Sequence, residues 1–293
     1  MGINIKLANR LLKSIGEIDP PGCCSDDLEH PSPSLRKKRL VEIGFVIEHR
    51  FAFYYWLRCK QKMMVEERSR SRSADKNFRP PDLITWDWHD DVGGECDFDK
   101  KELADLNQAN EEEVALFCWA GLQQINDGHI APALWLNALG NVYVLQKQKD
   151  CEDCQRESGP FEDRYGQVHN VWYFRSPKNL AKHFAKSNSK SGVIWDVDLD
   201  FFTKGEEVPD QCYTPPVSAR TIRTLLNPQK LWMQQILGGL RAVTIALEPV
   251  YTGGLTQSLV LYKTWEECLF DAPVFSENCR WREDLLLNRP TIR

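Results

Sequence analysis

The chain has 293 residues and 42% of them are hydrophobic, so it can bury a full core, and one large α/β domain is the expected architecture. The formal net charge of −5 argues against a general nucleic-acid-binding surface, whereas it is compatible with a cationic substrate. The sequence has neither a secretory signal nor the roughly 18 consecutive apolar residues that a bilayer-crossing helix requires. We therefore expect a cytoplasmic protein without a membrane partner.

The ten cysteines are scattered singly, apart from Cys23-Cys24 and Cys151-x-x-Cys154. Reduced thiols are expected in a long chain that lacks a signal peptide. The Cys151 and Cys154 pair could be half of a zinc knuckle, but no second pair of cysteines or histidines follows at the usual spacing. A polar loop without a metal is the favoured interpretation.

The first 38 residues are predicted to form an extension. A short amphipathic helix at residues 5–15 is followed by proline-rich breakers at residues 19–22 and 31–34. Residues 39–293 are predicted to form the folded domain. The extension could recruit a substrate or a partner, or regulate the domain, and the sequence leaves these roles open.

The domain is predicted to begin with an apolar strand at residues 40–48 and an aromatic helix from Phe51 to about Lys62. Residues 66–81 are of low complexity and contain an Arg-Ser repeat at residues 68–73, which predicts a loop. The arginines of this loop could contact RNA or an acidic partner, but a solvated linker is favoured.

Helices and strands alternate through the rest of the chain. Asn110 is a suitable N-cap for a helix that continues through Leu122, because the three glutamates after it suit the positive end of the helix dipole. The further predicted elements are one or two strands at 134–145, a polar loop at 151–167, a helix at 179–187, a strand at 193–196, a helix at 228–240 and a strand at 242–247. This alternation predicts a three-layer α/β/α fold with a mainly parallel central sheet.

Two acidic runs follow strand-like stretches and are the most informative part of the sequence. The first contains Asp87, His89 and Asp91 after an apolar stretch at residues 83–86. Because side chains two apart in a strand share a face, these three are expected to converge. The strand ends of a parallel sheet are also where such folds bind ligands.

The second run contains Asp196, Asp198 and Asp200 after the apolar stretch at residues 192–195, and His49 ends a third apolar stretch. Carboxylates gathered at neighbouring strand ends would repel one another unless cations lay between them. The two runs, together with His49, therefore predict a metal centre.

These motifs resemble the arginase–deacetylase superfamily over residues 40–255. The D-x-H-x-D of Asp87, His89 and Asp91 resembles the ureohydrolase motif, the D-V-D at Asp196 resembles the later one, and His49 stands where the family has its upstream histidine. The resemblance implies that residues 39–293 form an arginase-like catalytic domain with two Mn(II) ions. One ion would be held by His49, Asp87, Asp91 and Asp196, and the other by Asp87, His89, Asp196 and Asp198.

The chemistry implied by this resemblance is hydrolysis of a guanidino group. Asp87 and Asp196 would bridge two cations about 3.5 Å apart, which make a shared water acidic enough to ionise at neutral pH. Oxygen ligands with some imidazole suit Mn(II), although Co(II) and Fe(II) share these preferences. Asp200 is expected to support the ligands. The residues predicted to act in catalysis are Asp91, His129 and Glu248.

Glu248 and His129 have separate predicted roles. Glu248 ends a strand and is placed like the family's acid that holds the substrate guanidinium. His129 is the candidate proton shuttle to the leaving amine, because the pKa of histidine lies near neutrality. A capping or core histidine is the alternative for His129.

Departures from the family motifs point to a particular branch. Ile47-Glu48-His49 replaces the usual glycine-rich motif, and Val92-Gly93-Gly94 stands where small-molecule arginases have an asparagine that helps to hold the free amino acid's α-carboxylate. Free arginine is therefore expected to bind poorly. The remaining motifs resemble a divergent branch that includes the peptide arginases of ribosomal peptide maturation, which convert arginine residues to ornithine.

The sequence thus predicts a dimanganese peptide arginase whose partner is an arginine-containing precursor peptide. Three alternatives stay open: a ureohydrolase of a small guanidino or formimino compound, an amide deacetylase of the same superfamily, and a non-catalytic, metal-stabilised interaction module. Nucleic acid is not expected as a partner, because a basic surface is lacking. The sequence does not indicate the oligomeric state.

Overall fold

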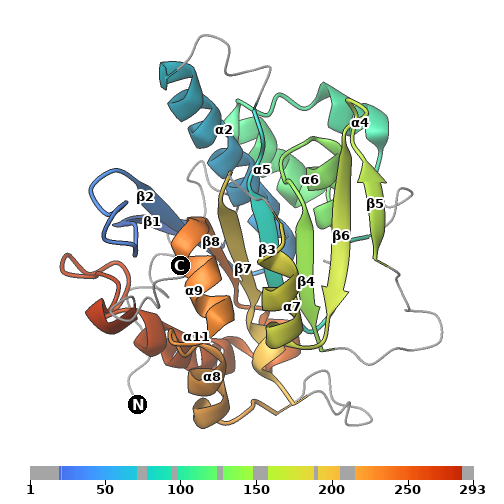
Figure 1. Ribbon diagram of the computed structural model, residues 1–293. Helices are drawn as coiled ribbons and strands as arrows, with labels where there is room; N and C mark the ends of the chain where they lie inside the picture. The colour runs from blue at the N-terminus through green and yellow to red at the C-terminus, as the bar shows by residue number, and fades with distance from the viewer. Residues whose placement is uncertain are drawn as a thin grey trace.

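The computed structural model describes residue 20 and residues 22–70, 78–93, 98–123, 128–147, 158–187, 191–204 and 215–285. A twisted sheet runs through the centre of these residues (Figure 1), and its eight described strands have the order β1-β2-β8-β7-β3-β4-β6-β5. They are β1 (Cys23–Glu29), β2 (Leu40–Val46), β3 (Asp82–Asp87), β4 (Val142–Gln146), β5 (Gly159–Glu162), β6 (Val168–Phe174), β7 (Val193–Asp198) and β8 (Leu240–Ala246). The strands between β1 and β5 run parallel, and these two edge strands pair antiparallel with their neighbours.

Helices cover both faces of the sheet. One face carries α2 (Ala52–Arg70), α4 (Lys100–Asp105), α5 (Glu111–Ala120) and α6 (Ile130–Trp135). The other carries α7 (Pro177–Phe184), α8 (Ala219–Leu225), α9 (Leu231–Gly239) and α11 (Leu255–Leu269). Short elements are η1 (His49–Phe51), η2 (Leu199–Phe202), α10 (Pro249–Thr252) and η3 (Glu283–Leu285). The predicted three-layer arrangement with a mainly parallel sheet is confirmed.

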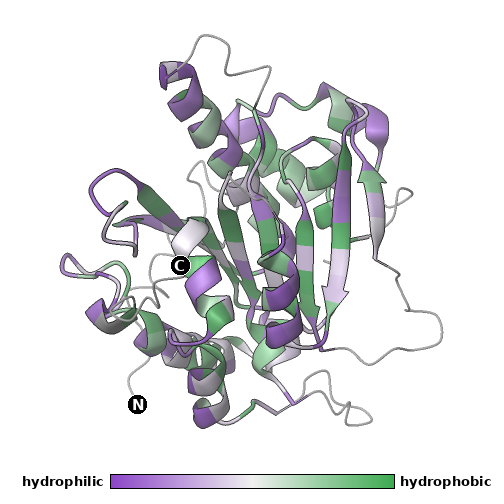
Figure 2. Cartoon of the chain, viewed as in Figure 1, coloured by the Kyte–Doolittle hydropathy of each residue, from purple (hydrophilic) through white to green (hydrophobic). Residues whose placement is uncertain are grey.

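Two hydrophobic cores lie on the two sides of the sheet, and the central strands contribute to both. In β7, Trp195 and Val197 face the α9–α11 side, whereas Ile194 faces the α2 side. Figure 2 shows hydrophobic residues along these central strands. Because side chains alternate, Asp196 and Asp198 share the α2 face with Ile194. The buried acids therefore lie under α2 and α6.

The first predicted strand and the helix that begins after Asn110 are confirmed. The apolar run at residues 40–48 forms β2, whose strand part is Leu40–Val46. The Asn110 side chain accepts hydrogen bonds from the backbone N–H groups of Glu112 and Glu113, as an N-cap residue does. The later predicted helix at 179–187 and strand at 193–196 correspond to α7 and β7 with shifted ends.

The predicted end of the aromatic helix was wrong. The helix does not stop near Lys62 but continues as α2 to Arg70, so the first part of the predicted 66–81 loop is helical. Glutamate and arginine are good helix formers, and Glu66 gains an ion pair with Arg241 at 3.2 Å. Residues 71–77, which contain the rest of the Arg-Ser repeat, lie outside the described residues.

Two further predictions differ from the structure. The predicted strand region at 134–145 starts inside α6 and only residues from Val142 onward form β4, because a buried run of apolar residues suits a helix or a strand equally. The predicted polar loop at 151–167 contains β5 at Gly159–Glu162, which pairs with β6 at the sheet edge. Cys151 and Cys154 lie outside the described residues.

The segment predicted as an extension takes part in the sheet. Strand β1 at Cys23–Glu29 pairs antiparallel with β2, in the register Cys23 to Val46. The helix predicted at residues 5–15 lies outside the described residues. The six described cysteines are free thiols, as expected, and no described helix is both long and apolar enough to cross a bilayer.

Packing of α2 on β2 depends on a glycine. A Cβ atom at Gly44 would lie 2.7 Å from the Tyr55 ring. We expect Gly44→Ala to lower the free energy of unfolding by about 1–3 kcal/mol, because neither the strand nor the buried ring can move without strain. Urea unfolding measures the difference. In the matched variant Gly238→Ala, the added methyl meets nothing within 4 Å on α9, so no loss is expected. Equal effects of the two variants would contradict this account.

Candidate metal centre

The candidate site lies at the carboxyl ends of four neighbouring parallel strands. Asp87 ends β3, Asp196 and Asp198 lie in β7, His49 begins η1 after β2, and Glu248 follows β8. All five side chains are at most 4% exposed. The sheet topology therefore brings together residues that are up to 199 positions apart in the sequence.

His49 is at the centre of this group. Its Nδ1 atom lies 2.7 Å from Asp91 Oδ2 and 3.2 Å from Asp87 Oδ2, and its Nε2 atom lies 2.7 Å from Asp196 Oδ2. The backbone N–H of His49 donates to the Glu248 carboxylate. One imidazole thus contacts acids from β3, from the segment after it and from β7.

Two acids of the site have left-handed backbones. The φ angles are 46° at Asp91 and 41° at Glu248, in a region where a residue other than glycine is strained. At Asp91, the backbone carbonyl accepts a hydrogen bond from Ile130 N at 3.3 Å, which ties this turn to the start of α6. The surrounding structure therefore holds both carboxylates in positions that an unconstrained chain would avoid.

Three groups of side chains, all buried except His89, have ligand atoms close enough to hold a metal ion. The groups are His49, Asp91 and His129; His49, Asp87, Asp91 and Asp198; and Asp87, His89 and Asp200. In each group the atoms lie within 4.8 Å of one another. Asp87 belongs to the last two groups and joins them.

The third group contains a residue that sequence reasoning placed behind the ligands. Asp200 Oδ2 lies 3.3 Å from His89 Nδ1, and Asp200 Oδ1 accepts a hydrogen bond from the backbone N–H of Trp88 at 3.0 Å. Strand alternation did not predict this position, because β7 ends at Asp198 and Asp200 lies in η2. The D-x-D-x-D spacing at 196–200 was the available signal.

His89 is the accessible member of the centre. Its side chain is 36% exposed, and the Tyr251 ring, itself 40% exposed, packs edge-to-face against it at 5.6 Å between centroids. Val250 beside it is also exposed. A ligand approaching from solvent therefore meets His89 and the α10 residues first.

His129 lies on the inner side of the same centre. Its ring stacks on Trp56 at 5.2 Å and contacts His49 edge-to-face at 4.4 Å between centroids. Neither ring nitrogen has a hydrogen-bond partner among the described residues, and the side chain makes no helix-capping bond. Burial, with a smaller contribution from His49, lowers its pKa well below the usual value. His129 is therefore a neutral, buried imidazole beside metal-type ligands.

Asp196 is anchored by two threonines on the neighbouring strands. Its carboxylate accepts hydrogen bonds from Thr85 Oγ1 at 2.8 Å and from Thr244 Oγ1, and Thr244 in turn accepts from Trp56 Nε1 at 3.1 Å. Asp196 is not in any of the three described groups, although its contact with His49 places it next to two of them. Its predicted bridging role stays a prediction, whereas Asp87, the other predicted bridge, belongs to both the second and the third group.

The electrostatics of the site require a compensating charge. Burial and neighbouring carboxylates raise the pKa values of Asp91, Asp198 and Asp200. Burial likewise opposes ionisation of Asp87, but its close contact with His49 and the charges of His49 and His89 outweigh this and lower its pKa to about 2. Asp87 Oδ2 and Asp200 Oδ2 make no well-formed hydrogen bond with the described residues, and lie 3.2 Å and 3.3 Å from ring nitrogens of His49 and His89. Neither ring nitrogen of His129 has a hydrogen-bond partner among the described residues.

Oxygen and imidazole donors that lack hydrogen bonds are what a divalent cation coordinates. A cation among them would also offset the repulsion between the buried carboxylates. These buried His/Asp groups can therefore hold a metal ion.

We expect Mn(II) to raise the melting temperature of the wild-type protein by about 5 °C at 100 times its Kd, since a ligand of the folded state stabilises it. Asp87→Asn should remove most of this rise, because it removes the negative charge and one of the two ligand oxygens of the shared residue. Differential scanning calorimetry with and without the metal measures the rise. Asp163→Asn is the matched control, because Asp163 is a buried acid that bonds the backbone of Tyr165 and Gln167 instead. A full rise in Asp87→Asn would exclude this centre.

No protein-family model matches this chain, and no curated protein matches it.

Proposed function

We propose that the chain is a dimanganese hydrolase that acts on the guanidino groups of arginine residues in a peptide, giving ornithine residues and urea. The observation that carries this proposal is the pair of ligand groups that share Asp87. Two cations joined by one carboxylate are the arrangement that two-metal hydrolases use. The resemblance of the motifs to the ureohydrolases, and the three-layer fold, support the same reading.

The residues that would hold the metals follow from the two groups. His49, Asp91 and Asp198 would hold one cation with Asp87, and His89 and Asp200 would hold the other with Asp87. When bound, two such cations supply Lewis acidity and a water that ionises at neutral pH. This assignment keeps Asp87 as a bridge, leaves out the predicted second bridge Asp196, and makes Asp200 a ligand. In this assignment Asp196 holds the orientation of the His49 ring through a hydrogen bond with His49 Nε2.

Glu248 is the residue proposed to orient the substrate. It is buried beside Asp198, and its carboxylate is fixed by the backbone N–H of His49. A carboxylate binds a planar guanidinium through paired charge-assisted hydrogen bonds, which hold the carbon in one position for attack. The left-handed backbone at Glu248 is strained, and a role in positioning the substrate would explain why this strain is retained.

His129 and the rim complete the proposed site. The His129 ring against His49 suits either a further nitrogen ligand or the predicted proton shuttle to the leaving amine. Val92 and Gly93, which follow Asp91, offer no polar side chain that could anchor a free α-carboxylate. The exposed Tyr251 and Val250 beside His89 offer an apolar surface to the neighbours of an arginine residue. These features favour a peptide over free arginine.

A second candidate is an amide deacetylase with one metal. The group of Asp87, His89 and Asp200 favours it, because an Asp-x-His pair with one later aspartate would suffice for a mononuclear site. The buried ligands of the other groups would then have no role, so the two-metal reaction accounts for more of the site.

The proposed reaction is tested by mass spectrometry of Mn(II)-loaded protein with an arginine-containing peptide, free arginine and an acetyl-lysine peptide. We expect loss of CH₂N₂ from the first peptide alone, together with urea. Turnover of free arginine only would contradict the argument from the missing anchor. Deacetylation without urea would replace the proposal by the second candidate.

Glu248→Gln should bind Mn(II) as the wild type does yet lose at least about a hundredfold in kcat/KM, since one charge-assisted guanidinium contact is removed. Metal content by mass spectrometry and urea release measure the two effects. Glu266→Gln is the control, because this buried glutamate bonds Tyr262 and Val274 on α11 and its neighbouring segment. Wild-type urea release in Glu248→Gln would remove this residue from the site.

A further inference from the structure

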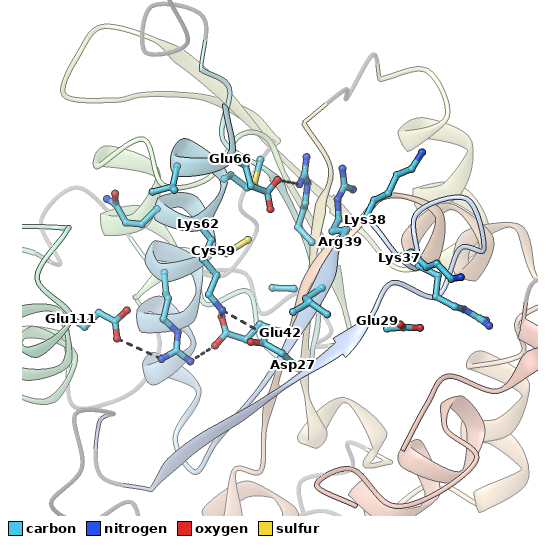
Figure 3. A pocket seen from close by; sticks show the side chains of 18 residues that line it. Asp27, Glu29, Lys37, Lys38, Arg39, Glu42, Cys59, Lys62, Glu66 and Glu111 are labelled. Carbon is cyan, nitrogen blue, oxygen red and sulfur yellow. Dashed lines mark hydrogen bonds and ion pairs between the residues drawn. The ribbon is translucent and has the colours of Figure 1, made fainter. Parts of the chain in front are cut away.

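A cavity of about 740 Å³ lies at the amino ends of β2 and β8, the end of the sheet opposite the candidate metal centre. Its walls come from α2, from the last residues of β1, and from the segment Arg36–Arg39 between β1 and β2. Figure 3 shows Lys37, Lys38 and Arg39 on one side and Cys59, Lys62 and Glu111 on the other. The volume is that of a typical ligand pocket, which spans about 300–1,000 Å³.

The lining is more basic than the chain as a whole. Seven lysine and arginine residues line it against five aspartate and glutamate residues, in a chain whose net charge is −5. This local reversal of sign attracts an anionic ligand to the cavity.

Four of the five acids of the lining form ion pairs with basic residues of α2 and β8. Glu42 forms ion pairs with Arg58 and, at 3.2 Å, with Lys62, and Glu66 pairs with Arg241 at 3.2 Å. Among the described residues, the side chains of Arg36–Arg39 form no ion pair. The excess positive charge therefore lies on this segment.

Arg39 lies within this excess charge. Burial and, to a smaller extent, the nearby charge of Arg241 lower the pKa of Arg39, although Glu66 acts in the opposite direction. A carboxylate bound between Arg39 and the neighbouring lysines would supply the missing charge through charge-assisted hydrogen bonds.

The cavity also has an aliphatic part. Leu40 is 59% exposed and Val65 is 65% exposed, and both line the cavity together with Met63. Aromatic side chains are missing from the lining residues that the structure describes, so a nucleobase would find no ring to stack on. The five lining acids would in addition repel a dense polyanion such as nucleic acid.

We propose that this cavity binds a short acidic segment of a peptide, with its carboxylates on Lys37, Lys38 and Arg39 and its aliphatic side chains on Leu40 and Val65. The inference goes beyond the proposed hydrolase activity and does not rest on it, because the cavity shares no residue with the metal centre. A segment with alternating acidic and aliphatic residues fits both parts of the lining.

The test is fluorescence anisotropy of the full chain with a fluorescein-labelled peptide of alternating glutamate and leucine, measured with and without Mn(II). We expect saturable binding in both cases that weakens with added salt. Lys37→Glu/Lys38→Glu should weaken binding by about tenfold or more, because two attractive contacts become repulsive. Both side chains are exposed, so the variant is expected to fold.

Two further variants make the result specific. Lys178→Glu/Lys182→Glu changes the charge equally on α7, whose residues do not line the cavity, and should leave the affinity within about twofold. Val65→Ser should weaken binding by about threefold to tenfold through the lost aliphatic contact. Equal losses in both lysine pairs would reduce the effect to net charge and overturn the proposal.

Two competing probes complete the experiment. A lysine–leucine peptide of the same length should not bind, and its binding with equal affinity would overturn the role of charge. A thymidine oligonucleotide of equal net charge should bind more weakly, and tighter binding would assign the cavity to nucleic acid instead. Urea release is not a readout here, so failure of this proposal is distinguishable from failure of the proposed hydrolase.

Discussion

Five buried aspartates around the imidazoles of His49 and His89 set the conditions that the surrounding structure must satisfy. Asp87, Asp91, Asp196, Asp198 and Asp200 are each at most 4% exposed, in the part of the sheet where the chain also buries His49 completely. Charges removed from water cost several kcal/mol each unless partners replace the lost solvation. The parallel strands supply such partners, because their carboxyl ends lie at one edge of the sheet. Asp196, for example, is contacted by Thr85, Thr244 and His49 from neighbouring strands and the segment after β2.

Most of the neighbouring structure can be understood as support for these carboxylates. The threonines of β3 and β8 hold Asp196, and Trp56 of α2 holds Thr244 while its ring covers His129. The left-handed turns at Asp91 and Glu248 aim two further carboxylates at the same place. Helix α2 thus connects the two ends of the sheet: its first turns cover the metal centre, and its later residues line the basic cavity.

The layers of the fold and most residues of the candidate site could be predicted from the sequence. The reason is that the alternation of side chains along β3 and β7 is a local property of each strand. Asp87 and Asp196 follow continuous apolar runs, and such runs predict buried parallel strands. The sequence was not sufficient for Asp200, which owes its place to a 3-10 turn, or for the stacking of His129 on Trp56. Strand β1 was not predicted, because its polar residues carry no local strand pattern. They form a strand through pairing with β2, which a local sequence pattern does not show.

The row of Thr85, Asp196 and Thr244 crosses three adjacent strands at paired positions. Sliding one strand by a single residue would turn its side chains to the opposite face and separate all three. The same slip would carry the apolar side chains of β7, such as Trp195, into the polar layer. The polar row and the hydrophobic layer behind it therefore select one alignment of the strands together, so misaligned sheets are penalised on both faces even before any ligand is bound.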